Sequence, residues 1–251
     1  MRYFIEIAYK GTNYHGWQSQ KNQTVPTIQG VLEKALSTIL RTPIEILGSG
    51  RTDTGVHAKQ TFAHFDVAEA LDCEKYVYKF NALLPFDISI MRMFPVDDQA
   101  HARFDATTRS YEYHLHLSRD PFLQELSYFH KEPVNVERMN EAAKLLLGRK
   151  DFQCFSKVKT DVNNYFCEIF HAQWELRDKD HLIFHITANR FLRNMVRAIV
   201  GTLLEVGRER MTPQQVLEVI DSKNRSVAGR SVPSDGLYLS KVLYPFIKEN
   251  A

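Results

Sequence analysis

Two kinds of local pattern alternate along this sequence of 251 residues, and their order limits the folds it can adopt. Segments rich in β-branched and aromatic residues, such as 2–10, indicate strands. Segments with apolar residues at helical spacing, such as 27–40 behind Thr27 as an N-cap, indicate amphipathic helices. Both kinds recur in a similar order in the two halves of the chain. We therefore expect an α+β fold of two similar halves with mixed, mostly antiparallel sheets.

These patterns also place the individual elements. In the first half we expect strands at 2–10, 43–50, 61–66 and 88–96 and helices at 27–40 and 74–84. In the second half we expect strands at 109–117, 168–176, 182–189 and 236–244 and helices at 136–147, at 190–207 and from the capping box Thr212–Gln215 onward. The polar stretch 96–109 separates the two halves, and it predicts domains of residues 1–104 and 105–251.

The overall composition indicates a globular protein without an obvious charged partner. The chain is 44% hydrophobic, it lacks a long apolar run, and its N-terminus does not resemble a signal peptide, so we expect a cytoplasmic protein that does not enter a membrane. The formal net charge is only +2, so local basic patches would have to hold any polyanion. The three cysteines are far apart and form no C-x-x-C pair, which predicts reduced, buried thiols.

The segment "GSGRTDTGVHA", residues 48–58, crowds charged side chains among small residues. Its glycines permit tight turns and close backbone approach, and we expect a buried or half-buried carboxylate at Asp53. One interpretation is that Asp53 only caps a turn. The other is that Arg51 and His57 are cations that keep a reactive Asp53 ionised.

Two rival interpretations of this segment have less support. Asp53, His57 and His64 could together bind a metal ion, but their spacing matches no standard ligand motif and no second acidic cluster follows. A phosphate-binding loop would need a G-K-[ST] ending or the G-x-G-x-x-G spacing, and the segment has neither. We therefore expect no metal site.

The second half contributes an aromatic residue and three arginines to the candidate site. Tyr111 alternates with Arg109 on one face of the expected strand 109–117, so it is either a core residue or a stacking platform. Arg190, Arg193 and Arg197 form a stripe on the expected helix 190–207. A solvated face explains such a stripe, but Arg197 lies among buried positions, where we expect it to meet a carboxylate.

Several further basic residues lie close to aromatic residues in the sequence, a combination that is typical of surfaces for phosphates and bases. The basic residues are Lys75, Lys79, Arg103, Arg109, Lys157, Lys159, Arg225 and Arg230. The aromatic residues are Tyr76, Tyr78, Phe104 and Phe155.

Taken together and in order, these motifs resemble the tRNA pseudouridine synthase A family over nearly the whole chain. The segments that carry the resemblance are "AYKGTNYHGWQSQ", "TIQGVLEKAL", "GSGRTDTGVHA", "ARFDATTRSYEY", "DFQCFS", "ANRFLRNMVRAIVGTLLEVG" and "DGLYLSKVLYP". Ser49 and Thr54 stand where the family often has alanine, and "GRSVPSDGLYL" replaces a more usual threonine and alanine before the proline.

This resemblance implies the pseudouridine synthase fold, in which two similar halves join across a central RNA-binding cleft. It also implies a homodimer, a tRNA substrate modified in the anticodon stem-loop at tRNA positions 38 to 40, and catalysis without a metal or an organic cofactor. Residues matching the family's site are the catalytic Asp53, Arg51 for flipping the target base, Tyr111 for stacking on it, and Arg197 as the partner of Asp53. Weaker substrate-binding candidates are Arg109, Arg190, Arg193, Leu237 and Leu239.

The sequence leaves the mechanism and one functional alternative open. Asp53 could attack C1' or C6 of the target nucleotide, or it could remove the C2' proton. An RNA-binding module without catalytic activity could have the same fold, but a carboxylate would repel the phosphates of its ligand. A metal-dependent hydrolase acting on nucleic acid is a third possibility.

Overall fold

The computed structural model describes residues 1–19, 24–158 and 164–247. Lys159, one of the basic residues considered for RNA binding, lies outside the described residues. The chain forms two compact units, Met1–Thr107 together with the chain from Leu239 onward, and Thr108–Tyr238. The division of the sequence into domains 1–104 and 105–251 stays a prediction.

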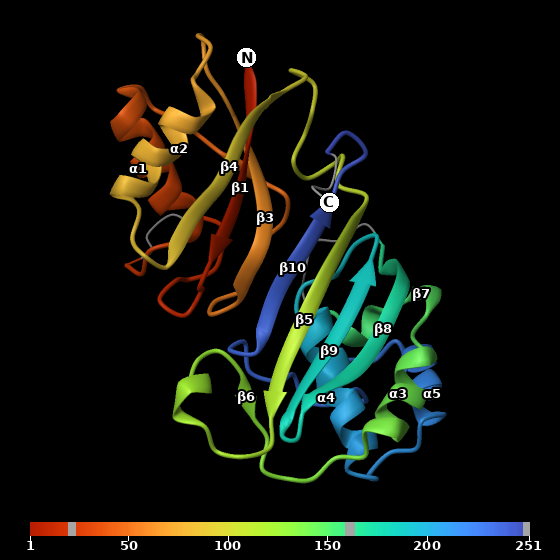
Figure 1. Ribbon diagram of the computed structural model, residues 1–251. Coiled ribbons are helices and arrows are strands. Elements are labelled where there is room, and N and C mark those ends of the chain that lie inside the picture. The colour runs from red at the N-terminus through yellow and green to blue at the C-terminus, as the bar shows by residue number, and fades with distance from the viewer. Residues whose placement is uncertain (20–23, 159–163, 248–251) are drawn as a thin grey trace. The chain divides into compact units, whose positions relative to one another are not determined.

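The first unit is built on a sheet with the strand order β4-β1-β3-β10 (Figure 1). These strands are β1 (Arg2–Tyr9), β3 (His57–Asp66), β4 (Ile88–Val96) and β10 (Leu237–Leu243), and the short β2 (Leu47–Gly48) pairs with β3. Strand β1 is antiparallel to both of its neighbours, with Ile5 opposite Ala63 on β3 and Met93 on β4. The alternating apolar residues of β1 thereby enter the core of this unit.

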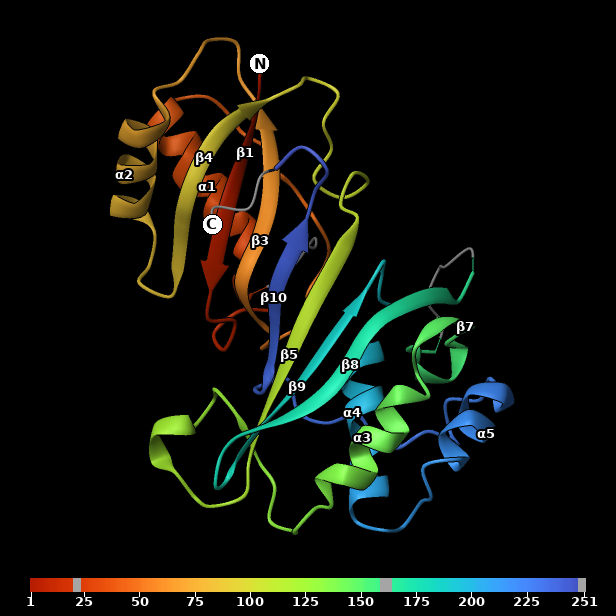
Figure 2. The ribbon, with the colours of Figure 1, turned by 45° about the vertical axis from the view of Figure 1, so that its right-hand side comes forward.

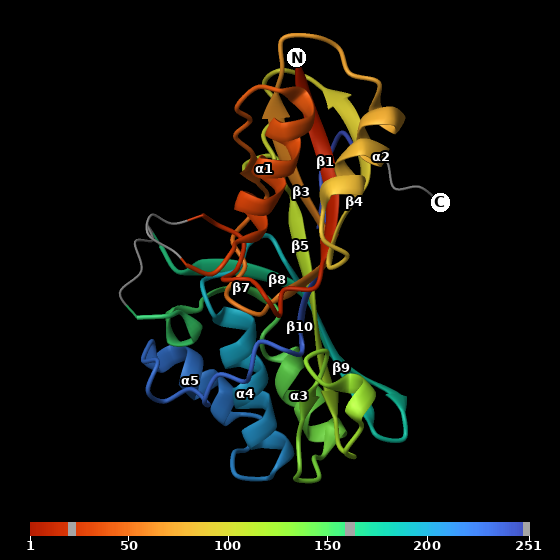
Figure 3. The same ribbon diagram turned by 90° about the vertical axis from the view of Figure 1, so that its left-hand side faces the viewer.

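Two helices cover one face of this sheet, as Figures 2 and 3 show. Helix α1 (Ile28–Leu40) begins where expected because the side-chain oxygen of Thr27 accepts a hydrogen bond from the Gly30 N–H at 3.2 Å. Helix α2 (Cys73–Leu83) begins after Asp72, whose carboxylate accepts from the Lys75 N–H. These caps fix the starts of both helices.

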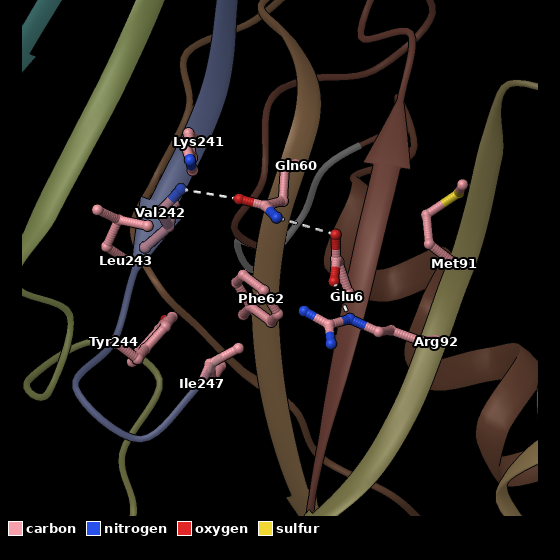
Figure 4. Close-up of a pocket in the computed structure, with 10 residues that line it drawn as sticks. All are labelled: Glu6, Gln60, Phe62, Met91, Arg92, Lys241, Val242, Leu243, Tyr244 and Ile247. Carbon is pink, nitrogen blue, oxygen red and sulfur yellow. Dashed lines mark hydrogen bonds and ion pairs between the residues drawn. The ribbon is translucent and has the colours of Figure 1, made fainter. Parts of the chain in front are cut away.

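A hollow of about 320 Å³ in the first unit lies on strands β1, β3, β4 and β10 and the segment after β10 (Figure 4). Glu6 forms an ion pair with Arg92, and Gln60 donates to Glu6 while accepting from the Val242 N–H. The ring of Phe62 packs edge-on against Tyr244 at 5.2 Å beside these polar groups. None of the residues that line this hollow belongs to the segment 48–58.

The second unit has a sheet with the order β5-β9-β8-β7, and β6 adds to β5 in parallel. Its strands are β5 (Thr108–His116), β6 (Tyr128–Phe129), β7 (Gly148–Asp151), β8 (Phe166–Asp178) and β9 (His181–Ala188). Its helices are α3 (Val136–Lys144), α4 (Met195–Gly207) and α5 (Gln215–Ser222). Helix α3 packs against α4 and β8 (Figure 1), and the core between sheet and helices includes Trp174, Phe184 and Ile199.

The predicted α+β class with mostly antiparallel pairing is confirmed, but several local predictions are wrong. The strand expected at 43–50 is only the two-residue β2, and the helix expected from Thr212 begins at Gln215. The helix expected at 190–207 begins only at Met195, because Asn194 adopts a left-handed backbone conformation with φ +67°. Arg190 and Arg193 therefore precede the helix and form no helical stripe with Arg197. The helix expected at 136–147 ends at Lys144, and the polar residues after it form β7, which no sequence pattern indicated.

Two of the three cysteines are buried, as the composition predicted. Cys154 and Cys167 are buried free cysteines, and burial raises the pKa of these thiols to about 12 and about 11. Cys73 is half-buried, and burial raises its pKa as well. Within the described parts of the chain, no helix is both long and apolar enough to cross a membrane.

Candidate functional site

The segment 48–58, here called the Asp53 loop, is bound along its length to the segment 9–17 that follows β1. The Thr52 carbonyl accepts a hydrogen bond from the Trp17 N–H at 3.2 Å, and the Tyr14 carbonyl accepts one from the Gly55 N–H at 3.4 Å. These two bonds join backbone groups, so the path of one segment constrains the path of the other. Two motifs that are about forty residues apart in the sequence thus form one structure.

Side chains complete the contact between these two segments. The hydroxyl groups of Tyr9 and Thr52 lie 2.8 Å apart in a hydrogen bond, and Nδ1 of His57 accepts from the Gly11 N–H at 3.0 Å. His57 is buried, and its ring serves to hold Gly11 in place. The sequence predicted His57 as a cation beside Asp53, and the structure shows its Nδ1 engaged with the Gly11 backbone.

Glycines allow the two backbones to approach this closely. A Cβ on Gly11 would lie 1.9 Å from the carbonyl oxygen of Val56, and a Cβ on Gly16 would lie 2.3 Å from that of Thr52. Gly16 also has φ +80°, which favours glycine. No larger residue fits at either position without displacing the Asp53 loop.

Asp53 occupies a tight turn at the centre of this loop. Its carbonyl accepts from the Val56 N–H at 3.2 Å, and Gly55 has φ +77°. The Asp53 side chain is half-buried, as the sequence predicted, whereas Arg51 is exposed. The loop holds the carboxylate on a fixed backbone while leaving it partly open to solvent.

The same geometry engages one ring nitrogen in each of the two histidines considered as metal ligands with Asp53. Nδ1 of His64 accepts from the Ala102 N–H at 3.2 Å, and Nδ1 of His57 accepts from Gly11, so neither atom offers a lone pair to a metal. Within residues 1–19, 24–158 and 164–247, no group of three or more histidine, cysteine or acidic side chains is placed to hold a metal ion.

The candidate aromatic residue of the second unit lies where β5 emerges from the core. Tyr113 on β5 is fully buried, and its hydroxyl donates to the Pro233 carbonyl at 2.9 Å. Tyr111 on the same face is only half-buried and packs edge-on against Phe191, with ring centroids 5.0 Å apart. Arg109, two residues before Tyr111 and on the same face of β5, donates to the Asn189 carbonyl at 3.1 Å. The ring of Tyr111 is thus oriented but partly accessible.

Arg197 is a half-buried residue in the first turn of α4. Its Nε donates to the Val232 carbonyl at 2.7 Å, and its own carbonyl accepts from the Val232 N–H at 3.2 Å. A guanidinium has five N–H donors, and this bond to Val232 uses one of them. Arg193 is exposed and Arg190 is half-buried, both in the segment before the helix.

A polar cluster, here called the Arg197 clamp, shapes residues 225–232 from within and joins them to the start of α4 through Asn194 and Arg197. Arg225 donates to the carbonyl oxygens of Ala228 and Gly229 and, at 2.7 Å, to Oγ of Ser231. Asn194 also donates to Oγ of Ser231, at 2.6 Å. Sequence reasoning assigned Arg225 to a phosphate-binding surface and gave Asn194 no role, because their partners are revealed only by the fold.

Two comparisons with known proteins place the chain in a family. The sequence profile described as "tRNA pseudouridine synthase" matches residues 6–105 and 142–245. A relative from Bacteroides fragilis, named tRNA pseudouridine synthase A, is 49% identical over 245 residues, which covers 97% of this chain and 96% of that protein. This chain belongs to the tRNA pseudouridine synthase family. A protein of the same name from Bacillus subtilis is 39% identical over 248 residues, with 97% and 99% of the two chains covered.

Most of the candidate residues, but not all, lie inside the segments that match the family profile. Asp53, Arg51 and Arg197 lie inside the segments that match the family profile, whereas Tyr111 lies between them. Leu237 and Leu239 are also inside the matched segments, and both are buried, with exposed fractions of 6% and 3%. Family membership makes the protein an isomerase that acts on uridine in tRNA.

Proposed function

We propose that this protein converts uridine to pseudouridine in the anticodon stem-loop of tRNA, at positions 38 to 40, with Asp53 as its catalytic group. The observation that supports this most strongly is the Asp53 loop itself. A half-buried carboxylate stands on a backbone fixed by hydrogen bonds and glycine contacts to the segment 9–17. A carboxylate needed only as a turn cap would not require this elaborate support.

The reaction explains why one carboxylate is enough. Pseudouridine formation breaks the bond between N1 and C1', turns the uracil ring and joins C5 to C1', without net oxidation, reduction or hydrolysis. Asp53 can contribute in three ways: it attacks C1', it attacks C6, or it removes the proton at C2'. All three need an ionised carboxylate in a fixed position beside the target nucleotide, and none of them requires a metal or an organic cofactor.

The other candidate residues fit supporting roles in this reaction. A base inside a stem-loop must leave its stack before the enzyme can act on it. We assign the exposed Arg51 to displacing the target base and the partly accessible ring of Tyr111 to receiving it. Arg197 is the proposed ion-pair partner of Asp53. Arg109, Arg190 and Arg193 are proposed phosphate contacts, and Leu237 or Leu239 is the proposed apolar wall.

The assembly and location of the protein are parts of the same proposal. The net charge of +2 gives one chain little overall attraction for a long polyanionic stem-loop, which favours a homodimer that holds the RNA with two subunits. A tRNA substrate also supports a cytoplasmic location. Sedimentation of a dimer at micromolar concentration supports this assembly, whereas a fully active monomer contradicts it.

The test of the proposed function is tritium release from a tRNA transcript labelled at C5 of uridine. Isomerisation replaces the C5–H bond by the C5–C1' bond, so each turnover releases one tritium to solvent. We expect release with the purified protein alone, and unchanged release after addition of a chelator. Tight tRNA binding without release would identify an RNA-binding module. Cleavage of the RNA that the chelator abolishes, without tritium release, would identify a metal-dependent hydrolase.

A further inference from the structure

The turn of residues 101–105 in the first unit carries an aromatic ring out into solvent. Phe104 is 73% exposed, which is unusual for a phenylalanine because exposing its ring to water is unfavourable. The guanidinium carbon of Arg103 lies 5.6 Å from the centroid of this ring, and the ring of His101 lies 4.4 Å from it. An exposed aromatic side chain thus stands beside an exposed cation.

Hydrogen bonds within this turn fix the position of Phe104. Nδ1 of His101 accepts from the backbone N–H groups of Arg103 at 3.1 Å and of Phe104 at 3.4 Å. The carboxylate of Asp105 accepts from the His101 N–H at 2.7 Å, and the Asp105 N–H donates back to the His101 carbonyl at 3.1 Å. Hydrogen bonds therefore join the first and last residues of the turn, and they order the backbone that carries Phe104.

The same turn is anchored to the core of the first unit. Ala102 is fully buried, its N–H donates to Nδ1 of His64, and its carbonyl accepts from the hydroxyl of Tyr244. The rings of His64 and His101 pack edge-on with centroids 4.8 Å apart. Burial and the nearby Arg2 lower the pKa of His101, which keeps its ring neutral and able to accept hydrogen bonds.

A rigid turn with this pair of side chains suits a nucleic acid better than a protein surface. An exposed aromatic ring stacks on an unpaired base, and an adjacent arginine stacks on the base or binds a phosphate. The ordered backbone lowers the entropy lost on binding. A protein partner of similar affinity would need a larger apolar patch, whereas Arg103 beside the ring provides a charge that complements RNA.

We propose that Phe104 and Arg103 form a stacking site for an unpaired nucleotide of the tRNA, other than the uridine that is isomerised. This inference rests on the proposed function for the identity of the RNA. It gives the turn a role in substrate affinity and not in the chemical step, because the turn lies outside the Asp53 loop and contributes no group to the reaction.

The test is tRNA binding by Phe104→Ala, measured by fluorescence anisotropy with an unmodified transcript at several salt concentrations. Loss of one stacked base weakens binding roughly tenfold, and Phe104→Trp retains near wild-type affinity because it restores a stacking surface. Arg103→Ala weakens binding and lowers the slope of log K against log salt by about one. The matched control is Phe86→Ala, which removes a more exposed phenylalanine of the first unit and leaves affinity unchanged.

Two further measurements show whether a loss of tRNA affinity in Phe104→Ala comes from a lost RNA contact, from a slower chemical step or from a changed assembly state. At saturating protein, the single-turnover rate of Phe104→Ala stays within about twofold of wild type, and sedimentation shows the same assembly state. Wild-type affinity in Phe104→Ala, an equal loss in Phe86→Ala, or a loss that follows dissociation of subunits each overturns the stacking site. The last of these outcomes would assign Phe104 to a contact between copies of the chain.

This binding experiment is also independent of the catalytic proposal. A wild-type protein that binds tRNA but releases no tritium contradicts the proposed function. The tRNA affinities of wild type and Phe104→Ala can still be compared in that case. A wild-type protein that forms pseudouridine while Phe104→Ala binds normally contradicts the stacking site alone.

Discussion

The Asp53 loop and the Arg197 clamp are both held by hydrogen bonds, but different groups make those bonds. In the loop, backbone groups of Thr52 and Gly55 bond to the backbone of the segment 9–17. In the clamp, side chains of Arg225 and Asn194 bond to the chain at residues 228–231. The loop combines two side-chain bonds with a close approach of two backbones, whereas the clamp depends mainly on a few polar side chains.

This difference determines which substitutions each region tolerates. Contacts between backbone groups survive most changes of side chain but fail when added bulk separates the chains. Contacts made by polar side chains fail when one charged or amide group is removed, because its partners then lose their hydrogen bonds. Added volume should therefore damage the loop, whereas removal of a polar group should damage the clamp.

The largest effect in this comparison is expected for Arg197→Ala. We expect the single-turnover rate to fall by about 10²–10³, because the proposed partner of the Asp53 carboxylate is lost, while tRNA affinity changes little. Rapid-quench tritium release and anisotropy measure the two quantities. Arg197→Lys should recover only part of the rate, since a lysine lacks the fixed geometry of the guanidinium. Weaker binding with a normal rate would assign Arg197 to phosphate binding.

The second effect is a loss of stability in Gly16→Ala. A Cβ at this position would lie 2.3 Å from the Thr52 carbonyl oxygen, and φ is +80°, so we expect about 2–4 kcal/mol of destabilisation in urea unfolding. The matched control is Gly50→Ala in the Asp53 loop itself, where a Cβ would meet no atom within 4 Å. Equal effects of the two substitutions would show that close approach does not hold the loop.

A smaller effect is expected for Arg225→Met, which keeps much of the side chain's volume but removes its three hydrogen bonds in the clamp. Because the Val232 carbonyl then holds Arg197 less firmly, we expect kcat to fall about tenfold with little change in KM. Arg230→Met is the control, since Arg230 is an exposed residue of the same segment. A change in KM alone would place Arg225 in RNA binding.

The smallest effects, on tRNA affinity, are expected for cationic residues near the clamp. Lys157 and Arg193 are exposed, and the Lys157 N–H donates to the Arg193 carbonyl at 3.0 Å. We expect alanine at Lys157, Arg190 or Arg193 to weaken tRNA binding several-fold and to lower the salt slope by about one for each lost phosphate contact. A salt slope equal to that of wild type removes the residue from the RNA surface.

Local patterns predicted the elements whose signals are local. Strand β4 was placed at its observed bounds, 88–96, because β-branched and apolar residues fill it and turns border it. Helix α1 began as predicted because its apolar spacing and the Thr27 cap agree. The half-buried state of Asp53 also followed from the glycines and small residues around it.

Features that depend on distant residues could not be predicted. The late start of α4 depends on the left-handed Asn194, whose side chain bonds to Ser231, 37 residues away. Apolar spacing continues through residues 190–194, so periodicity alone favours an earlier start. In the same way, nothing local indicates that His57 accepts a hydrogen bond from Gly11, 46 residues earlier. Such contacts follow only from the tertiary fold.

The most direct test of the catalytic role of Asp53 is the Asp53→Asn variant in the tritium-release assay. Asparagine keeps the shape of the side chain and accepts hydrogen bonds, but it removes the charge that all three catalytic routes require. We expect the single-turnover rate to fall by several powers of ten, while thermal unfolding shows a folded protein and tRNA binding is retained or tightened. A folded Asp53→Asn protein that releases tritium at a near wild-type rate would contradict the assignment of Asp53 as the catalytic group.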